Sequence, residues 1–85
     1  MSSPEYDAEI DARGLLCPLP VLKAAKRLRA MHEGARLRLL ADDPAAVVDV
    51  PHFCAERGHA LLSVEEDEGG RAYLIRRGAD RPEPD

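Results

Sequence analysis

The spacing of hydrophobic residues changes repeatedly along this chain between the period of a strand and that of a helix. Ala8, Ile10 and Ala12 alternate with acidic residues and predict a first strand, after which Gly14 breaks the pattern. A helical period follows from Pro18. A second alternating run over 35–43 predicts another strand. The chain therefore begins with a strand, a helix and a strand.

The first helix has an amphipathic pattern. The residues expected on its core-facing side are Val21, Leu22, Ala25, Leu28 and Met31. Gly34 follows at a position where a left-handed residue would end the helix. In the strand after it, Leu37 and Leu39 should point inward and the arginines between them outward.

A second helix is expected to open at Asp43-Pro44, with aspartate as N-cap and proline at the first helical position. Pro51 lies inside this segment and predicts either a kink or a restart, with Asp49 as a fresh cap. Gly58 should end the helix.

The residues 59–77 have the pattern of a hairpin around Gly69-Gly70, a pair that can adopt the positive φ angles of a tight turn. The order βαβαββ predicts an α/β (α+β) two-layer sandwich, with two helices on one face of a mixed four-stranded sheet. The first two strands, joined by a helix, should be parallel with a right-handed connection. The carboxyl end of the first strand is where open α/β sheets tend to bind ligands.

Length and composition limit the function. A chain of 85 residues predicts a single domain with one small core, folded over about 8–78, with disordered tails at 1–7 and 79–85. A net charge of −4 argues against general nucleic-acid binding. No apolar run is long enough to span a bilayer, and the N-terminus lacks a secretory signal, so we expect a cytoplasmic monomer.

Cys17 opens the first helix in an unusual context, because Pro18 and Pro20 follow it in the first turn. A residue before proline favours extended backbone, which predicts Cys17 as the N-cap, and the amide of Leu19 as the principal donor facing the sulfur. The positive end of the helix dipole would favour the thiolate and lower the thiol pKa. The sequence thus predicts a nucleophile.

The residues around Cys17 limit the kinds of reaction that it can carry out. None of the three histidines is placed as an obvious base for a cysteine hydrolase, and the sequence CPLP has proline where a dithiol oxidoreductase has its resolving cysteine. A single exposed cysteine suits a persulfide carrier, because a neighbouring thiol would release the extra sulfur as sulfide. Two alternatives remain, a non-catalytic interaction or regulatory module and a two-cysteine redox or metal-handling protein.

The segments IDARGLLCPLPVLKAAKRL and ADDPAAVVDVPHFCAERGHALL resemble the TusA/SirA family of sulfur-carrier proteins. The resemblance runs from about Glu9 to Arg77 and includes Cys-Pro-x-Pro, Asp42-Asp43-Pro44 and Asp49-x-Pro51. The best-known tRNA-thiolation members resemble GLRCPEP at this motif. In this chain Leu16 and Leu19 replace the Arg and the Glu of that pattern.

The resemblance implies the same βαβαββ sandwich and a sulfurtransferase-type carrier without a cofactor, in which Cys17 accepts sulfane sulfur as a persulfide. Its implied partners are a donor of the cysteine desulfurase or rhodanese type and an acceptor protein. Family members serve tRNA thiolation, molybdenum-cofactor synthesis or sulfur oxidation. Because the residues flanking this motif are more hydrophobic here, the resemblance does not identify the docking partner.

Other residues carry weaker predictions. Arg13 could hold an anionic sulfur, and Asp11 could orient the loop. Cys54 is expected in the core, and His52, Cys54 and His59 match no common zinc spacing. The first helix also has a basic outer face, which is either a solvated surface or a docking surface for an acidic partner, and comprises Lys23, Lys26, Arg27 and Arg29.

Overall fold

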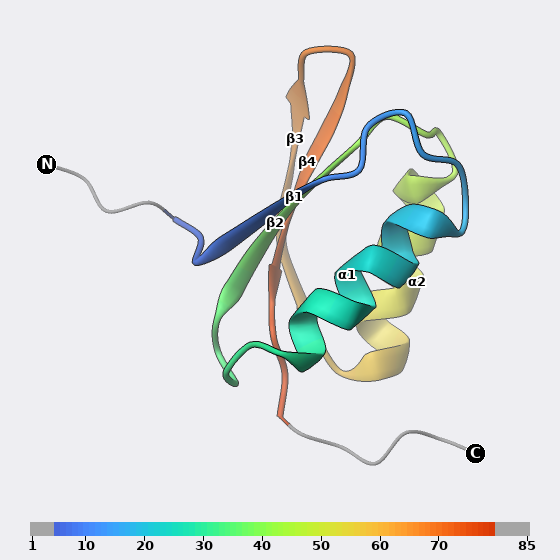
Figure 1. Ribbon diagram of the computed structural model, residues 1–85. Helices are drawn as coiled ribbons and strands as arrows, with labels where there is room; N and C mark the ends of the chain where they lie inside the picture. Colours follow the sequence, from blue (N-terminus) through green and yellow to red (C-terminus); the bar gives the residue numbers. More distant parts are fainter. Residues whose placement is uncertain (1–4, 80–85) are drawn as a thin grey trace, which may run out of the picture.

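The computed structural model describes residues 5–79. Residues 1–4 and 80–85, on which most of the expected tails fall, lie outside the described residues. The elements follow the order β1 (Ala8–Asp11), α1 (Leu19–Arg29), β2 (Arg36–Ala41), α2 (Ala46–Arg57), β3 (Ala60–Asp67) and β4 (Gly70–Arg76) (Figure 1). The predicted order βαβαββ is confirmed.

The four strands form one mixed sheet in the order β1-β2-β4-β3. β1 and β2 are parallel, with Ile10 opposite Leu39, and the remaining pairs are antiparallel. Both helices lie on the same face of this sheet (Figure 1), so the predicted two-layer arrangement is also confirmed. The parallel pair brings the end of β1 beside the end of β2, where each strand leads toward a helix.

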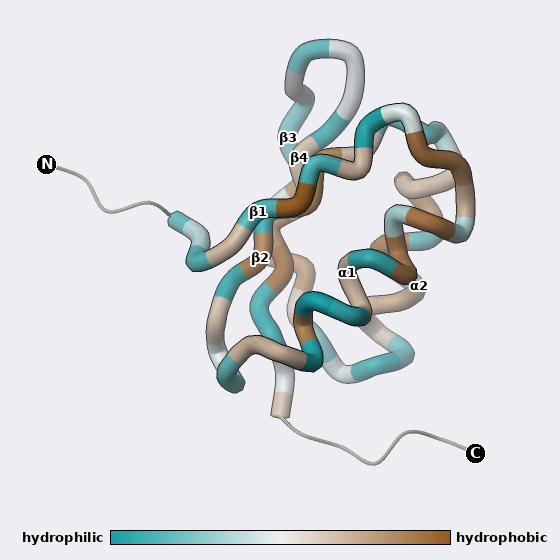
Figure 2. The backbone as a smooth tube through the Cα atoms, in the orientation of Figure 1, coloured by the Kyte–Doolittle hydropathy of each residue, from teal (hydrophilic) through white to brown (hydrophobic). Residues whose placement is uncertain are grey.

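The core lies between the sheet and the two helices. The largest fully buried side chains come from α1, β2, α2 and β4, and they are Leu28, Leu37, Leu39, Val50, Tyr73 and Ile75. Leu37 and Leu39 point inward as predicted, because a period of two places them on one face of β2. Hydrophilic and hydrophobic residues alternate in the first four residues of β2, and the strand ends with buried Leu40 and Ala41 (Figure 2).

The buried face of α1 differs from the prediction at one position. Leu28 is fully buried, and Val21, Ala25 and Met31 pack against the core as predicted. Ala24 is also fully buried, whereas Leu22 is 56% exposed. Ala24 lies one helical turn before Leu28 and therefore on the same side, while Leu22 is two positions from Ala24 and turned away from the sheet. The small side chain of Ala24 is therefore buried in place of the larger side chain of Leu22.

Two helix boundaries also differ. α1 ends at Arg29, and the amides of Ala30 and Met31 bond back to the last turn, so Gly34 lies beyond the helix in the turn before β2. α2 begins at Ala46, after a turn in which the Asp43 carbonyl and carboxylate accept the amides of Ala46 and Ala45.

α2 is continuous through Pro51, so the helix does not restart there and Asp49 is not a fresh cap. Gly58 ends the helix with a φ of 79°, as predicted. The hairpin is confirmed as well, with Gly69 at a φ of 70° in the turn between β3 and β4. No helix within residues 5–79 is both long and apolar enough to cross a membrane.

Near the N-terminus, Tyr6 and Asp7 of the expected tail contact β2, with Arg38 lying 5.6 Å from the centre of the Tyr6 ring. The amide of Asp7 donates to the carbonyl of Arg36 (2.8 Å), and the amide of Arg36 donates to the Asp7 carboxylate (2.8 Å). Ordered structure therefore starts before β1.

Candidate functional site

Cys17 lies in the loop that connects β1 to α1, and its side chain is exposed. The peptide bond between Cys17 and Pro18 is cis, and α1 begins directly after it at Leu19. Two carboxylates from a different part of the chain contact the cysteine. Asp43 precedes α2 and Asp49 lies in the first turn of α2.

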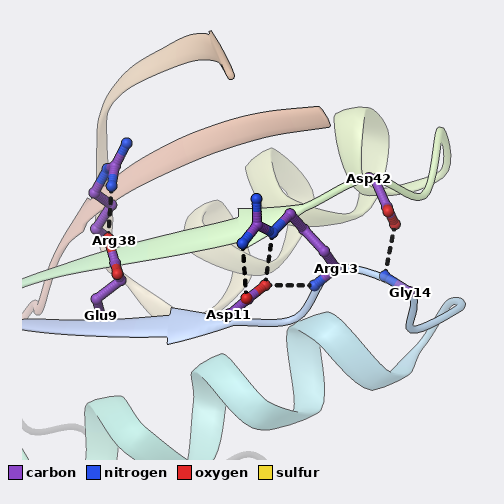
Figure 3. A network of polar contacts seen from close by, with 6 residues as sticks. All are labelled: Glu9, Asp11, Arg13, Gly14, Arg38 and Asp42. Atoms are coloured by element: carbon purple, nitrogen blue, oxygen red, sulfur yellow. Dashed lines mark hydrogen bonds and ion pairs between the residues drawn. The ribbon is translucent and has the colours of Figure 1, made fainter. Parts of the chain in front are cut away.

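The backbone of the loop is fixed by the turn that follows β2. The amide of Cys17 donates to Asp43 Oδ2 (2.6 Å), and the amide of Gly14 donates to Asp42 Oδ1 (2.9 Å). The second of these bonds is visible in Figure 3. Because the ends of β1 and β2 lie side by side, two consecutive aspartates reach two points of the same loop. The position of Cys17 thus depends on the β2–α2 turn.

The thiol itself is bound by Asp49. Cys17 Sγ donates a hydrogen bond to Asp49 Oδ2, with a separation of 2.7 Å. A bond to an ionised carboxylate is stronger than one between neutral groups. The sulfur therefore has a defined partner rather than pointing freely into solvent.

This contact reverses the predicted effect on acidity. The hydrogen bond to Asp49 raises the pKa of Cys17 above its ordinary value, and partial desolvation and the charges of Asp49 and Asp43 act in the same direction. A helix N-terminus presents only about half an elementary charge, whereas Asp49 places a full negative charge at hydrogen-bond distance. The prediction of a lowered thiol pKa is wrong because the carboxylates outweigh the dipole.

The predicted capping geometry is also wrong. Pro18 rather than Cys17 occupies the N-cap position of α1, without a side-chain hydrogen bond. The amide of Leu19 donates to the carbonyl of Leu16 (2.9 Å) instead of facing the sulfur. Pro20 is buried in the first turn. The two prolines thus shape the start of the helix, while the thiol is held by α2.

An open depression of about 240 Å³ adjoins the thiol. Its lining comes from the start of α1 and from one side of α2, and comprises Cys17, Pro18, Val21, Asp49, His52, Phe53, Glu56 and Arg57. Hydrophobic side chains near both helix starts are exposed, with Leu16 and Val48 each 70% and Leu19 46% accessible. The loop before α1 includes a hydrophobic stretch (Figure 2). A partner that reached the sulfur could bury apolar surface here.

Arg13 and Asp11 form a compact pair at the end of β1. Two guanidinium nitrogens of Arg13 donate to the Asp11 carboxylate (2.9 and 2.8 Å), and the Arg13 amide donates to the same group (3.1 Å) (Figure 3). These bonds lower the pKa of Asp11 to about 2. Asp11 therefore holds Arg13 and the start of the loop, and the expectation that Arg13 steadies an anionic sulfur stays a prediction.

The basic residues of α1 line a different hollow. Lys23, Lys26 and Arg27 surround a depression of about 330 Å³ together with Ile10 and Ala30. None of the residues that line the depression beside the thiol is shared with this one. A docking role for the basic face is a prediction separate from the chemistry of Cys17.

Cys54 is buried as predicted, with 2% of its surface exposed, and burial raises its thiol pKa to about 11. His52 is on the surface beside Glu56, and His59 Nδ1 accepts the amide of Gly78 (3.0 Å). Within the described residues, no three side chains of His, Cys, Asp or Glu are grouped to hold a metal ion.

Sequence reasoning missed Asp43 and Asp49 as site residues, because it gave both of them a role in starting the second helix. The available signal was the expected parallel pairing of β1 and β2, which places the segments after these strands next to each other. A carboxylate after the second strand can then reach a cysteine after the first.

Comparisons with known proteins show which family this chain belongs to. The model of the family described as sulfurtransferase TusA matches residues 8–77. The chain is 43% identical over 75 residues to the sulfur carrier protein TusA of Pseudomonas entomophila strain L48, covering 88% of this chain and 94% of that protein.

The fold is similar to the crystal structure of a SirA-like protein from Desulfitobacterium hafniense, with a TM-score of 0.75 and 27% identity. The match covers 86% of this chain and all of the other. With a family match over nearly all of the described residues and a relative at this identity, the chain belongs to the TusA sulfurtransferase family.

Proposed function

We propose that this protein is a sulfur carrier that holds sulfane sulfur as a persulfide on Cys17 and passes it to an acceptor protein. The observation that supports this most is the contrast between its two cysteines. Cys17 is an exposed thiol in an open depression, while Cys54 is buried. A loaded Cys17 therefore has no exposed second thiol within the described residues to release its sulfur as sulfide.

The loading step transfers one sulfur atom without net oxidation. Sγ of Cys17 attacks the outer sulfur of a donor persulfide, R–S–S⁻, so that the Sγ–S bond forms and the donor S–S bond breaks. The Cys17 proton ends on the donor sulfur, which leaves as R–SH, and the carrier becomes Cys17–S–S⁻. Delivery is the same exchange, with the carrier as donor and a thiol of the acceptor as nucleophile.

The partners of this exchange are proteins that expose a reactive sulfur. The donor is a cysteine desulfurase or a rhodanese-type enzyme, and the acceptor belongs to tRNA thiolation, molybdenum-cofactor synthesis or sulfur oxidation. Exposed Leu16 and Leu19, which flank Cys17-Pro18 in the chain, and exposed Val48 in the first turn of α2 offer apolar surface for docking. The proposal places the carrier in the cytoplasm, where reducing conditions keep its cysteines as thiols.

The test is intact mass spectrometry after incubation with a cysteine desulfurase and L-cysteine. The wild-type protein should gain the mass of one sulfur atom, which peptide mapping should assign to Cys17, and a reductant should remove it. Cys54→Ser is the matched control and should load like the wild type. Cys17→Ser should fold but remain unloaded.

Two results would contradict the proposal. Loading that persists in Cys17→Ser would show that a residue other than Cys17 accepts the sulfur. Loading that needs both cysteines would favour a two-cysteine redox protein.

A further inference from the structure

We infer that Asp49 is a positioning residue that keeps the thiol of the empty carrier protonated and oriented, so that Cys17 reacts slowly until a donor engages it. This inference rests on the proposed function, because it concerns the same sulfur. Its geometric basis is the 2.7 Å hydrogen bond from Cys17 Sγ to Asp49 Oδ2.

Both ends of this hydrogen bond are fixed by the fold. The backbone of Cys17 is held by the bond from its amide to Asp43. Asp49 belongs to α2, and its own amide donates to the carbonyl of Ala45 (2.9 Å). Because both backbones are anchored, only the side-chain rotations of Cys17 and Asp49 are restricted when the contact forms, which favours its persistence.

The other charged groups around the sulfur do not replace Asp49. Asp43, from the β2–α2 turn, uses its carboxylate on the amides of Cys17 and Ala45. The remaining charged or titratable side chains that line the depression belong to α2, and they are His52, Glu56 and Arg57. At the start of α1 the lining consists of the N-cap residue Pro18 and of Val21, which carry no charge.

The bond distinguishes the empty from the loaded carrier. In the thiol form Sγ carries the proton that Asp49 accepts. In the persulfide form Sγ is bonded to carbon and to the outer sulfur, so it has no proton to donate. Loading must therefore break this bond, and the proton leaves Sγ as the donor sulfur departs. Asp49 stabilises only the discharged state, and ionisation of Sγ would place two negative groups in contact.

The first test compares alkylation of Cys17 against pH in three proteins that all carry Cys54→Ser: the parent, Asp49→Asn and Glu56→Gln. Iodoacetamide serves as the probe. Asp49→Asn removes the charge but keeps the shape, and it should shift the profile to lower pH and raise the rate at pH 7 at least about threefold. Glu56→Gln removes a charge from the same helix and depression, and it should leave the profile unchanged. An unchanged profile in a folded Asp49→Asn protein overturns the inference.

A second measurement needs no variant at Asp49. Cys17 of the folded parent should titrate at higher pH than Cys17 of the same chain unfolded in urea. A folded profile at equal or lower pH overturns the inference even if Asp49→Asn does not fold. Loading by the desulfurase is measured as a separate experiment. If loading is normal and the alkylation profile of Asp49→Asn is unchanged, the inference about Asp49 is rejected and the carrier function stands. If the profile shifts and no loading occurs, the carrier function is rejected and the inference about Asp49 stands.

Discussion

Replacing Asp43 with alanine should destabilise the protein, because one carboxylate serves two backbone segments. Its Oδ2 accepts the amide of Cys17 at 2.6 Å and its Oδ1 accepts the amide of Ala45 at 3.1 Å. Alanine leaves both amides without this partner. The first loss frees the loop that carries the thiol, and the second loosens the turn that leads into α2.

The expected cost follows from the two hydrogen bonds. A hydrogen bond to a charged group contributes about 1.5–3 kcal/mol, and partial access of water reduces this to about 1 kcal/mol for each bond here. Asp43→Ala should therefore lower the free energy of unfolding by about 2 kcal/mol. For a chain of this size, that corresponds to a decrease in Tm of roughly 8–16 °C. Asp43→Asn retains one acceptor oxygen and should cost about half as much.

The assay is urea unfolding followed by circular dichroism, with thermal unfolding as a second measurement. Glu33→Ala removes an exposed carboxylate from the loop between α1 and β2 and controls for the change in net charge. The expected order of stability is wild type, then Asp43→Asn, then Asp43→Ala, with Glu33→Ala close to the wild type. If Asp43→Ala lies within about 0.5 kcal/mol of Glu33→Ala, the two bonds do not anchor the loop.

Three further predictions concern other parts of the molecule. In Cys17→Ser, iodoacetamide should modify Cys54 only slowly until urea unfolds the chain. The reason is that Cys54 is 2% exposed and burial raises its thiol pKa to about 11. Rapid modification of the folded protein would contradict this and show that the core opens readily. Gly70→Ala should lower the free energy of unfolding, measured by urea titration, by more than about 1 kcal/mol, because the added methyl would lie 2.6 Å from the carbonyl oxygen of Ala41. Ser63→Ala serves as the comparison on the same sheet. Desolvation, with smaller effects from Arg77 and Arg57, lowers the pKa of His59, so the unfolded chain binds its proton more readily and stability should decrease as pH falls through about 6.5; urea titrations at several pH values should show a smaller decrease in His59→Gln.

Much of the fold could be predicted because the period of the hydrophobic residues reports directly on local structure. Alternation at Leu37 and Leu39 identified both the strand and its buried face. Gly58 marked a helix end correctly because a φ of 79° strongly favours glycine. Gly34 was a weaker marker, since it also has a positive φ but serves the turn before β2.

The choice between Leu22 and Ala24 on α1 went wrong because hydrophobicity was weighted above helical position. Hydrophobicity favours leucine for the core. Ala24, however, lies one helical turn before Leu28 and one turn after Val21, whereas Leu22 lies at the edge of that face. The structure follows position, with Ala24 fully buried and Leu22 56% exposed.

The candidate site was predicted only in part, because its contacts join distant parts of the chain. Cys17 stood out because its flanking prolines and helix start are local features. Its acidity was predicted with the wrong sign, because only the dipole of α1, a local feature, was considered, and the carboxylate of Asp49, 32 positions away, was not. The sequence contained Asp49, but its orientation toward the sulfur depends on how α2 packs beside α1.

The sequence separation of the contacts around Cys17 affects how the protein matures. The bonds to Gly14 and Cys17 join residues 26 to 32 positions apart, so local chain folding alone cannot form them. They require β1, β2 and the start of α2 to be assembled, and contacts of this range form late relative to helical turns. During synthesis, Cys17 emerges before the aspartates that bind it. The thiol of the nascent chain therefore lacks its hydrogen bond to Asp49 for a time, and its low reactivity is acquired only when folding is complete.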